Sequence, residues 1–392
     1  MSGLFSVFRR ELRRIFTERS AFSVMVLATV IYAGFYPQPY VNEALRSVPL
    51  VLVDQDRTTT SRELARRIDA TAEVAISASL TDLPTAEYHI YTRKAHGLLL
   101  IPPNFERDLL HGRPSPVALY ADASYFLIYQ QVALAVTGVA RTLGAEVEVA
   151  RLAALGIDLP LASAAADPMR LTTIALFNPQ GGYASYVLPA AFVLILQQTL
   201  LMGVGLLGAA GSGGLAGSNA NGRDEAGPTV TVAGKLLAYL ALHAVLLPAY
   251  LIGLPYLYGV PRLGDVASIL VFAVPFVLSV GALGLVIAKL LRSPLVMQLM
   301  MAALGLPFFF LAGFAWPFEA IPRPVQLVAY LLPSTSAIDG FVRLSQMGAS
   351  LSQVSGQLLL LWCLAAVYGC AACLLEWRSA RAAGSARVAP AA

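Results

Sequence analysis

Residues that could do chemistry are few in this chain, and their spacing matches no known catalytic pattern. His89, His96 and His111 lie close in sequence, but they form neither a helical i, i+4 pair nor a zinc-finger frame. Asp54 and Asp56 could act as paired carboxylates, although their place after an apolar run favours turn-forming aspartates. We therefore predict no metal site and no catalytic centre from these residues.

The cysteines and glycines also predict no reactive site. Cys370 and Cys373 have the spacing of a redox pair, but with Cys363 they fall in an apolar stretch that offers no thiolate-stabilising environment. Small packing residues are the favoured interpretation. The segment Gly227–Lys235 has the wrong spacing for a P-loop and is followed by Leu236 instead of Ser or Thr. We therefore do not expect this chain to hydrolyse ATP itself.

The distribution of charge indicates a membrane protein. Of the 392 residues, 57% are hydrophobic and 13% are charged, well below the roughly 25% charged residues of soluble domains. Six stretches without Asp, Glu, Lys or Arg are long enough for a spanning helix, which needs about 20 apolar residues. The predicted spans are residues 20–41, 183–207, 234–258, 266–288, 294–313 and 357–375.

Charged residues are concentrated between Glu43 and Arg170, where short β-branched runs alternate with helical patterns. The predicted strands are residues 48–53, 74–77, 97–101 and 117–121, and a long helix is expected over residues 122–155. Thr60 and Glu63 have the spacing of a capping box. The expected fold is an all-α polytopic membrane protein with six transmembrane helices and an inserted α/β domain, residues 42–177, between the first two.

Basic residues predict the orientation of the chain. Five arginines precede the first span, which favours a cytoplasmic N-terminus. The insert then lies on the far side, which is the periplasm if the chain resides in a bacterial inner (cytoplasmic) membrane. Six spans return the C-terminus to the cytoplasm, with residues 379–392 as a tail.

The first 19 residues have the pattern of an amphipathic helix. Arginines alternate there with apolar residues at helical spacing. The apolar residues are Leu4, Phe5, Phe8, Leu12, Ile15 and Phe16. A basic helix of this kind is suited to lie in the headgroup plane, so residues 1–19 are predicted to form a cytoplasmic interfacial helix.

Polar residues are scarce inside the predicted spans. Among Asp, Glu, Lys, Arg and His, only His243 lies well inside a span, and Glu319 and Asp339 lie near the outer boundary. Proton- or sodium-coupled carriers usually need ionisable groups near the midplane. Energy for transport is therefore expected to come from another subunit. An ATP-independent membrane receptor or scaffold, and a secondary carrier, are the alternatives with the same topology.

Several segments together resemble the permease subunit of ABC-2 type exporters, in the subclass with a large periplasmic insert after the first helix. Bacterial multidrug-efflux permeases belong to this subclass. The segments that carry the resemblance are Phe5–Arg19, Val51–Arg57, Ser61–Leu64, Gly97–Leu109, Leu119–Tyr125, Phe177–Pro179 and Ala312–Pro322. The resemblance covers essentially the whole chain. It implies that this chain binds no cofactor, because ATP and Mg²⁺ are bound by a separate cytoplasmic ATP-binding subunit.

The resemblance also implies partners and a coupling site. A second permease copy or a paralogue would complete the translocation path as a dimer in the lipid bilayer. A periplasmic membrane-fusion adaptor and an outer-membrane channel are further candidates, and no nucleic acid is expected. The residues expected to couple to the ATP-binding subunit are Glu11, Arg13, Arg14, Arg223, Asp224, Glu225, Gly227 and Lys235. The family's loop is shortened here to Pro228–Ala233, so a short or irregular coupling helix is expected.

The translocation path is expected between the second and fifth spans. The candidate residues of the path and its gate are Gln197, Gln198, Met297, Met301, Phe308, Phe309, Trp316 and Pro317. Met and Phe suit an adaptable apolar surface, and ordinary helix packing is the alternative. Five prolines from Pro307 to Pro333 predict a re-entrant pair of short helices that acts as an outer gate. Apolar drugs, lipids, polysaccharide and peptide are all compatible substrates.

Overall fold

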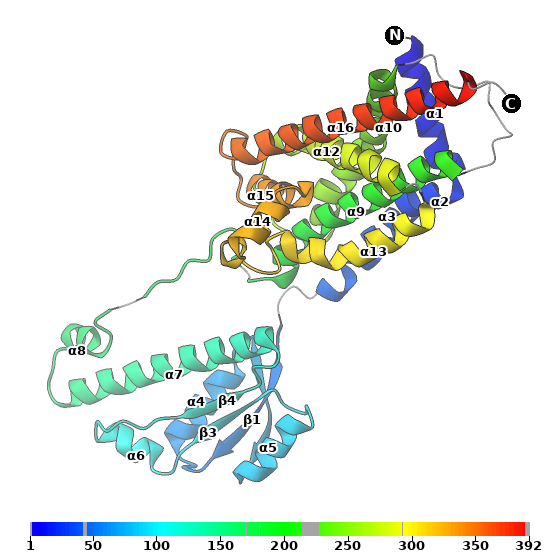
Figure 1. Cartoon of the computed structure of the whole chain (residues 1–392). Helices are drawn as coiled ribbons and strands as arrows, with labels where there is room; N and C mark the ends of the chain where they lie inside the picture. Colours follow the sequence, from blue (N-terminus) through cyan, green and yellow to red (C-terminus); the bar gives the residue numbers. More distant parts are fainter. Residues whose placement is uncertain are drawn as a thin grey trace. The chain divides into compact units, whose positions relative to one another are not determined.

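The computed structural model describes residues 2–41, 45–169, 171–179, 181–213, 227–291 and 293–388. The chain folds into two compact units (Figure 1). Residues Ala44–Ile174 form one, called here the insert unit, and the rest of the chain forms the membrane unit.

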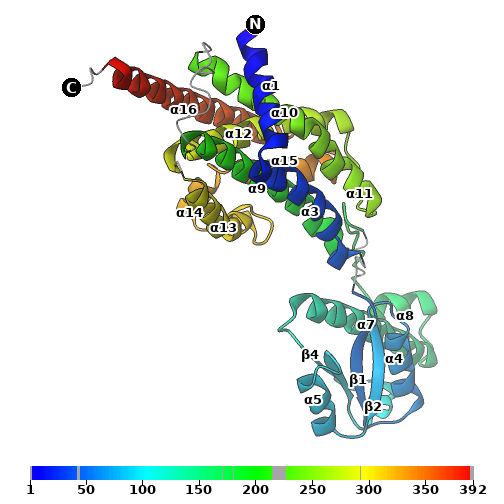
Figure 2. The same cartoon turned by 90° about the vertical axis from the view of Figure 1, so that its right-hand side faces the viewer.

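The membrane unit is entirely helical in its described part (Figures 1 and 2). Its main helices are α1 (Ser2–Thr17), α2 (Arg19–Phe22), α3 (Thr29–Phe35), α9 (Tyr183–Gly213), α10 (Pro228–Pro248), α11 (Leu254–Leu257), α12 (Val266–Leu291), α13 (Pro294–Leu311), α14 (Arg323–Ala329), α15 (Pro333–Ser345) and α16 (Ser355–Val388). π-helical turns at Ser23–Ala28 and Ala249–Gly253 join α2 to α3 and α10 to α11. The second turn follows Pro248, which lacks the N–H that continues an α-helix.

Seven helical stretches in the described part of the chain are long and apolar enough to cross a membrane. Six of them overlap the six predicted spans, and the seventh is α7 (Phe126–Ala154) of the insert unit. No charge-free window includes α7, because it carries charges such as Arg141 and Glu146. It lies along the sheet of the insert unit, with Val132 and Leu143 buried there. A helix pair, α14 with α15, is bent by 85° and adds an eighth candidate if it counts as one span.

Helix α9 is the centre of the membrane unit. Within its most apolar stretch 89% of the residues are buried, compared with 17% in α13 and in α16. Two glycines of α9 allow neighbouring helices to come close. A Cβ atom on Gly205 would overlap the Met297 side chain of α13, and one on Gly208 would lie 2.5 Å from Ala288 Cβ on α12. Small residues of this kind let membrane helices approach and pack tightly.

The insert unit is a four-stranded sheet with helices on both faces. Its elements are β1 (Val48–Asp54), α4 (Thr59–Asp69), β2 (Val74–Leu80), α5 (Leu83–Tyr91), β3 (Gly97–Ile101), α6 (Phe105–Leu110), β4 (Ala118–Ala121), α7 and α8 (Leu159–Ala166). The strand order is β2-β1-β3-β4, with β1 parallel to β2 and β3, and β4 antiparallel to β3. The predicted strands and the long helix are therefore confirmed.

Each face of the sheet has its own apolar core. Leu50 and Leu52 of β1 pack with Ile68 of α4 and with α7, and Val51 and Val53 point the other way, toward α5. This alternation follows from the two-residue period of a strand. Because both faces are covered, β1 is apolar along its length, as parallel strands in α/β folds are.

The predicted cap of α4 was wrong by two residues. Thr58 is the N-cap: its hydroxyl accepts a hydrogen bond from the Ser61 amide, and the Ser61 hydroxyl accepts one from the Thr58 amide. Thr60 instead donates its hydroxyl and its amide to Glu106 Oε1. A Ser at the third helical position can replace the usual Glu or Gln of the capping box, so the sequence pattern did not indicate it.

Asp54 and Asp56 stabilise the turn after β1, as predicted. Asp54 Oδ1 accepts hydrogen bonds from the amides of Asp56 and Arg57. Partial burial acts to raise the pKa of Asp56, but hydrogen bonds from the Thr58 hydroxyl and the Glu106 amide outweigh it and lower that pKa. These carboxylates are therefore satisfied within the protein, and in the described part of the chain no three His, Cys, Asp or Glu side chains are grouped to hold a metal.

Candidate functional site

Helix α1 packs along the first turns of α10 (Figure 2). Gly234 makes the approach possible, because a Cβ atom there would lie 2.8 Å from Val7 Cβ. Val7, Glu11 and Ile15 are buried, and Phe5 and Phe16 are exposed. The face of α1 that packs against the protein therefore differs from the apolar face predicted from sequence. It includes the acidic Glu11, and it leaves the Phe5 and Phe16 rings exposed.

A buried hydrogen-bond network joins α1 to both α9 and α10. The Tyr239 hydroxyl of α10 donates to Glu11 Oε1 at 2.7 Å, and both side chains are buried. Arg14 Nη1 lies 3.2 Å from Glu11 Oε2, and its Nη2 donates to the Leu207 carbonyl of α9 at 2.9 Å. We call this group of Glu11, Arg14, Tyr239 and the Leu207 carbonyl the N-terminal joint.

The N-terminal joint contacts the two helices that flank residues 214–226. Glu11 and Arg14 were both predicted as coupling residues, and the structure brings them together. Arg13 is exposed, Gly227 is exposed just before α10, and Lys235 is half-buried. The predicted coupling residues Arg223, Asp224 and Glu225 lie outside the described residues.

Two features of this region differ from the sequence prediction. Tyr239 was missed, because a tyrosine within an apolar span has no pattern that separates a network member from an ordinary interfacial aromatic. The segment Pro228–Ala233, predicted to be a shortened loop, forms the first turns of α10 instead. Proline at the first helical position explains this, since it needs no N–H there and its φ is already helical.

A second ion pair joins two other spans. Lys289 Nζ at the end of α12 lies 2.6 Å from Glu376 Oε2 of α16, and both side chains are about one-quarter exposed. The pair links the ends of α12 and α16, and ion pairs that keep contact with solvent add little stability.

Adjacent glutamines on α9 form a polar pair in the apolar interior. Gln197 Nε2 donates to Ser334 Oγ of α15 at 3.0 Å, and the Gln197 Oε1 atom has no partner among the described residues. Both amide atoms of Gln198 are buried without a partner in the described chain. Gln198 faces α13, since a Cβ atom on Gly305 would lie 3.8 Å from Gln198 Nε2. Burying an amide without a hydrogen-bond partner in such surroundings costs free energy. A polar group of a bound molecule would lower this cost by pairing with it.

The apolar candidates of the path are packed against other helices. Met297, Met301 and Phe308 of α13 are buried in the same core as α9. The Phe309 ring lies 4.7 Å from the Phe314 ring, edge to face. These contacts are those of ordinary helix packing, so a role in the path stays a prediction for these four residues.

Beyond α13 the chain forms broken helices around a cavity. Helix α13 continues through Pro307 to Leu311, and the bent pair lies later, at Arg323–Ala329 and Pro333–Ser345. Helix α14 lies within the predicted re-entrant segment of residues 307–333 and α15 begins at its end, and re-entry itself stays a prediction. Pro307 lies inside α13 and removes one backbone hydrogen bond there; prolines are tolerated inside membrane helices where neighbouring groups satisfy the freed carbonyl.

The cavity among these helices has a volume of about 420 Å³ and is called here the broken-helix cavity. Its walls include Tyr186 of α9, the α13–α14 connection, α15 and Gln357 of α16. The Tyr186 hydroxyl donates to the Phe314 carbonyl, and the Gln346 amide donates to the Ser185 carbonyl, so two bonds tie the connection and α15 to the start of α9. Pro317 lines the cavity, and Trp316 beside it is 59% exposed.

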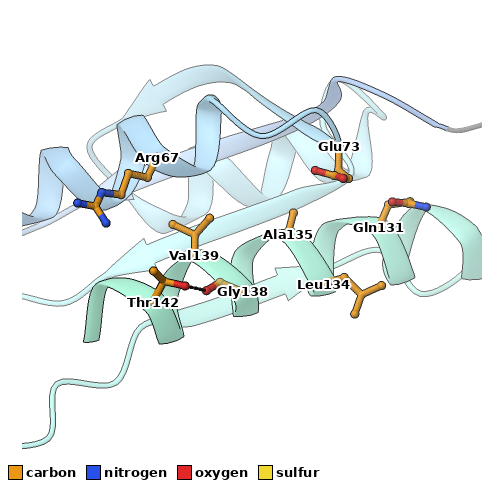
Figure 3. Close-up of a pocket in the computed structure, with 8 residues that line it drawn as sticks. All are labelled: Arg67, Glu73, Gln131, Leu134, Ala135, Gly138, Val139 and Thr142. Atoms are coloured by element: carbon orange, nitrogen blue, oxygen red, sulfur yellow. Dashed lines mark hydrogen bonds between the residues drawn. The ribbon is translucent and has the colours of Figure 1, made fainter. Parts of the chain in front are cut away.

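The insert unit has a groove between α4 and α7, with a volume of about 390 Å³ (Figure 3). Arg67 lines it, but its guanidinium is bound to Glu63 and Glu146 at 2.6 and 2.7 Å. The hydrogen bonds to these two carboxylates raise the pKa of Arg67. Leu134 and Val139 supply an apolar wall, and Thr142 donates its hydroxyl to the Gly138 carbonyl. This groove holds no nucleophile beside a base.

Comparison with known proteins places the chain in a family. Residues 19–374 match the model of the ABC-2 family transporter proteins, so the chain belongs to that family. It is a multi-pass membrane protein of the permease type. A relative is the linearmycin resistance permease protein LnrN of Bacillus subtilis (strain 168), 23% identical over 342 residues, a match that covers 82% of this chain and 85% of the relative.

Proposed function

We propose that this chain is the membrane subunit of an ATP-driven exporter, working as a dimer with separate ATP-binding subunits that hold ATP and Mg²⁺. Its place would be the bacterial inner membrane, with both termini cytoplasmic and the insert unit periplasmic. Arginines before the first span support this orientation. In both views α1 and the last turns of α16 lie toward one end of the membrane unit, and α14 lies toward the other.

The observation that carries the proposal is the N-terminal joint. A subunit that receives force from a partner needs a rigid element at the contact, connected to the helices that must move. The buried Glu11–Tyr239 and Arg14–Leu207 hydrogen bonds connect α1 to both helices that flank residues 214–226. Charged groups bonded within a buried network hold one geometry, because any displacement leaves a buried charge unpaired.

The direction of transport and the path complete the proposal. The relative's name links that protein to linearmycin resistance, which supports export as the direction here. The unpaired amide atoms of Gln197 and Gln198 support a path between α9 and α13, because a passing polar group would satisfy them. A periplasmic adaptor and an outer-membrane channel would fit the same scheme as further partners.

The test is purification of the tagged full chain from its native membrane in mild detergent, followed by mass spectrometry and an ATPase assay. We expect a stoichiometric P-loop subunit and ATPase activity. Replacing Arg223–Gly227 with a Gly/Ser linker should release that subunit. The matched control replaces His111–Pro116 of the insert unit in the same way and should leave the complex intact.

Each alternative has its own outcome in this experiment. Recovery of the chain alone, with no ATPase activity, would favour a receptor or scaffold. Transport in vesicles that depends on a proton gradient at zero ATP would favour a secondary carrier. Either result would overturn the exporter proposal.

A further inference from the structure

We propose that the broken-helix cavity binds a cationic amphiphile, a molecule with an ammonium head group, an apolar tail and no phosphate. The inference rests on the proposed export function in one respect only, that the bound molecule would be a substrate. Binding itself needs neither ATP nor a partner subunit, so it can be measured on the purified chain.

Aromatic rings form much of the cavity wall. Tyr186, Phe314, Phe318 and Tyr330 all line it. The rings of Phe318 and Tyr330 lie 5.2 Å apart with their planes at 63°, so the edge of one meets the face of the other. Aromatic faces attract ammonium groups within about 6 Å of the ring centre, and several rings around one site are the usual arrangement for quaternary ammonium ligands.

The charges on the wall are both negative. Glu319 and Asp339 line the cavity, and its lining includes no Lys or Arg. Asp339 accepts a hydrogen bond from Gln357 at 2.6 Å and lies 3.6 Å from Arg343. Glu319 is exposed and has no hydrogen bond or ion pair with any described residue. One free carboxylate therefore faces the cavity, ready to pair with a cation.

The sign of the charge selects against phospholipid head groups. A phosphate in this cavity would meet the free Glu319 carboxylate, and the nearby cation, Arg343, is already paired with Asp339. An ammonium without a phosphate can pair with Glu319 and avoids this repulsion. Among the described residues, no third His, Cys, Asp or Glu joins Glu319 and Asp339 to form a metal-binding group.

The size and surroundings of the cavity fit an amphiphile. About 420 Å³ is within the range of small-molecule sites. Leu327, Val328 and Leu331 expose more than half of their side-chain surface on and just after α14, next to Tyr330. An apolar tail could lie along these side chains while the head group occupies the cavity. This arrangement suits molecules that enter the cavity from the bilayer.

Fluorescence of Trp316 can report binding. The probe is dodecyltrimethylammonium, titrated into the full chain in phosphatidylcholine nanodiscs, with Trp362→Phe and Trp377→Phe so that Trp316 is the only tryptophan. The matched probe is dodecylphosphocholine, in which a phosphate and a two-carbon linker separate the same ammonium head and dodecyl tail. We expect a saturable change with the first probe and at least tenfold weaker binding of the second. Empty nanodiscs correct for partition into lipid.

Two variants and a control separate a specific site from general partition. Glu319→Gln and Tyr330→Leu should each weaken binding of the ammonium probe about fivefold or more. Glu18→Gln removes an exposed carboxylate away from the cavity and should change nothing. Thermal unfolding of each variant checks folding, and Glu319→Gln is expected to fold normally because its side chain makes no internal bond.

The outcomes distinguish this inference from the exporter proposal. A response without saturation, equal binding of both probes, or unchanged binding by Glu319→Gln would overturn the cationic-amphiphile site. If the ATP-binding subunit still co-purifies in that case, the exporter proposal stands. Specific ammonium binding by a chain that recovers no ATP-binding subunit would keep the site and remove its role in ATP-driven export.

Discussion

The two ends of the membrane unit are built differently. At the N-terminal joint, Glu11 of α1 bonds to Arg14 and to Tyr239 of α10, and Arg14 bonds to the Leu207 carbonyl of α9, so three helices are joined. At the broken-helix cavity two short helices meet at 85° and leave about 420 Å³ among polar and aromatic side chains. α1 and α14 lie toward opposite ends in both views (Figures 1 and 2).

This difference corresponds to two mechanical tasks. A filled, hydrogen-bonded joint resists deformation and can transmit a displacement, because close-packed interiors have low compressibility. A broken, hollow region can change shape at small cost, since few contacts must be exchanged when it opens. Helix α9 reaches both regions, through the Leu207 carbonyl at one end and Tyr186 at the other. It is therefore the element through which one end could act on the other.

The largest expected effect is from Glu11→Ala, which dismantles the joint. The substitution leaves the Tyr239 hydroxyl buried without its acceptor and Arg14 without its ion pair, so we expect a loss of about 3 kcal/mol in the free energy of unfolding. Unfolding by SDS in mixed micelles measures it. Glu18→Ala, at an exposed position of the same end of the chain, should stay within about 0.5 kcal/mol. Equal effects of the two would mean that the joint contributes nothing to stability.

The next effect tests whether α15 is firmly packed on the side away from the cavity. Gly340 faces α12, where a Cβ atom would overlap the Phe272 ring, and Phe272 is fully buried against Phe341. Gly340→Ala should therefore cost about 2 kcal/mol by overpacking. Gly369→Ala on α16 is the control, because nothing lies within 4 Å of that Cβ position. A neutral Gly340→Ala, measured by the same unfolding assay, would show that α15 is loosely held on both sides.

Tyr239→Phe is a milder break of the joint. It removes one hydroxyl and leaves the Glu11 carboxylate with Arg14 alone, for an expected loss of about 1.5 kcal/mol. Tyr256→Phe removes a hydroxyl from a side chain that is 90% exposed and should change the unfolding free energy by far less. Combined with Glu11→Ala, Tyr239→Phe should add almost nothing, since the two residues share one interaction. Full additivity would contradict a direct Glu11–Tyr239 bond.

The fourth test removes a polar side chain of the Gln197–Gln198 pair, which lies on α9 between the two ends, and predicts a gain of stability. Gln198→Leu replaces an amide whose two polar atoms are buried without partners among the described residues, so it should raise the unfolding free energy by about 1 kcal/mol. Gln197→Leu is the matched control, since it breaks the bond to Ser334 and should give no gain. If Gln197 and Gln198 line the translocation path, the Gln198→Leu protein should be more stable but should transport its substrate more slowly. A gain from both variants would show that the Ser334 bond contributes nothing.

The smallest effect depends on pH and concerns the start of α12. Asp265 accepts hydrogen bonds from the amide and hydroxyl of Ser268, which lower its pKa below the usual value of 3.8. Its stabilisation is therefore present above pH 3.8 and is lost as pH falls through the lowered value. Asp265→Asn should lower the melting temperature slightly at about pH 7 and less at about pH 3. A difference that grows on acidification would contradict this sign.

Much of the fold could be predicted from sequence because its signals are local. Charge-free stretches predicted six of the seven candidate spans, and short apolar runs predicted all four strands of the insert unit. The seventh, α7, was predicted instead as the long helix of the insert, and it lies along the sheet there. The cap at Thr58 was missed because Ser61 replaces the expected Glu or Gln. A cap of this kind is missed when a different residue type makes the same hydrogen bond.

The candidate sites were less predictable because they depend on distant contacts. Glu11 and Arg14 could be predicted as coupling residues, but their bond partners Tyr239 and the Leu207 carbonyl lie 228 and 193 residues further along the chain. The broken-helix cavity combines Tyr186 with residues far along the chain, and no sequence spacing indicates that they share a wall. The unpaired state of the Gln198 amide within the described chain likewise emerges only once α9 and α13 are packed.

The most direct test asks whether ATP-dependent movement of the helices around the broken-helix cavity requires an intact N-terminal joint. Spin labels at Leu327→Cys on α14 and Leu359→Cys on α16, both exposed positions, would report their distance in the complex with the ATP-binding subunit, after Cys363, Cys370 and Cys373 are changed to serine. We predict that ATP with vanadate changes this distance in the otherwise native chain and leaves it unchanged in Glu11→Ala, although the subunit stays bound. The same shift in Glu11→Ala would contradict coupling through the joint.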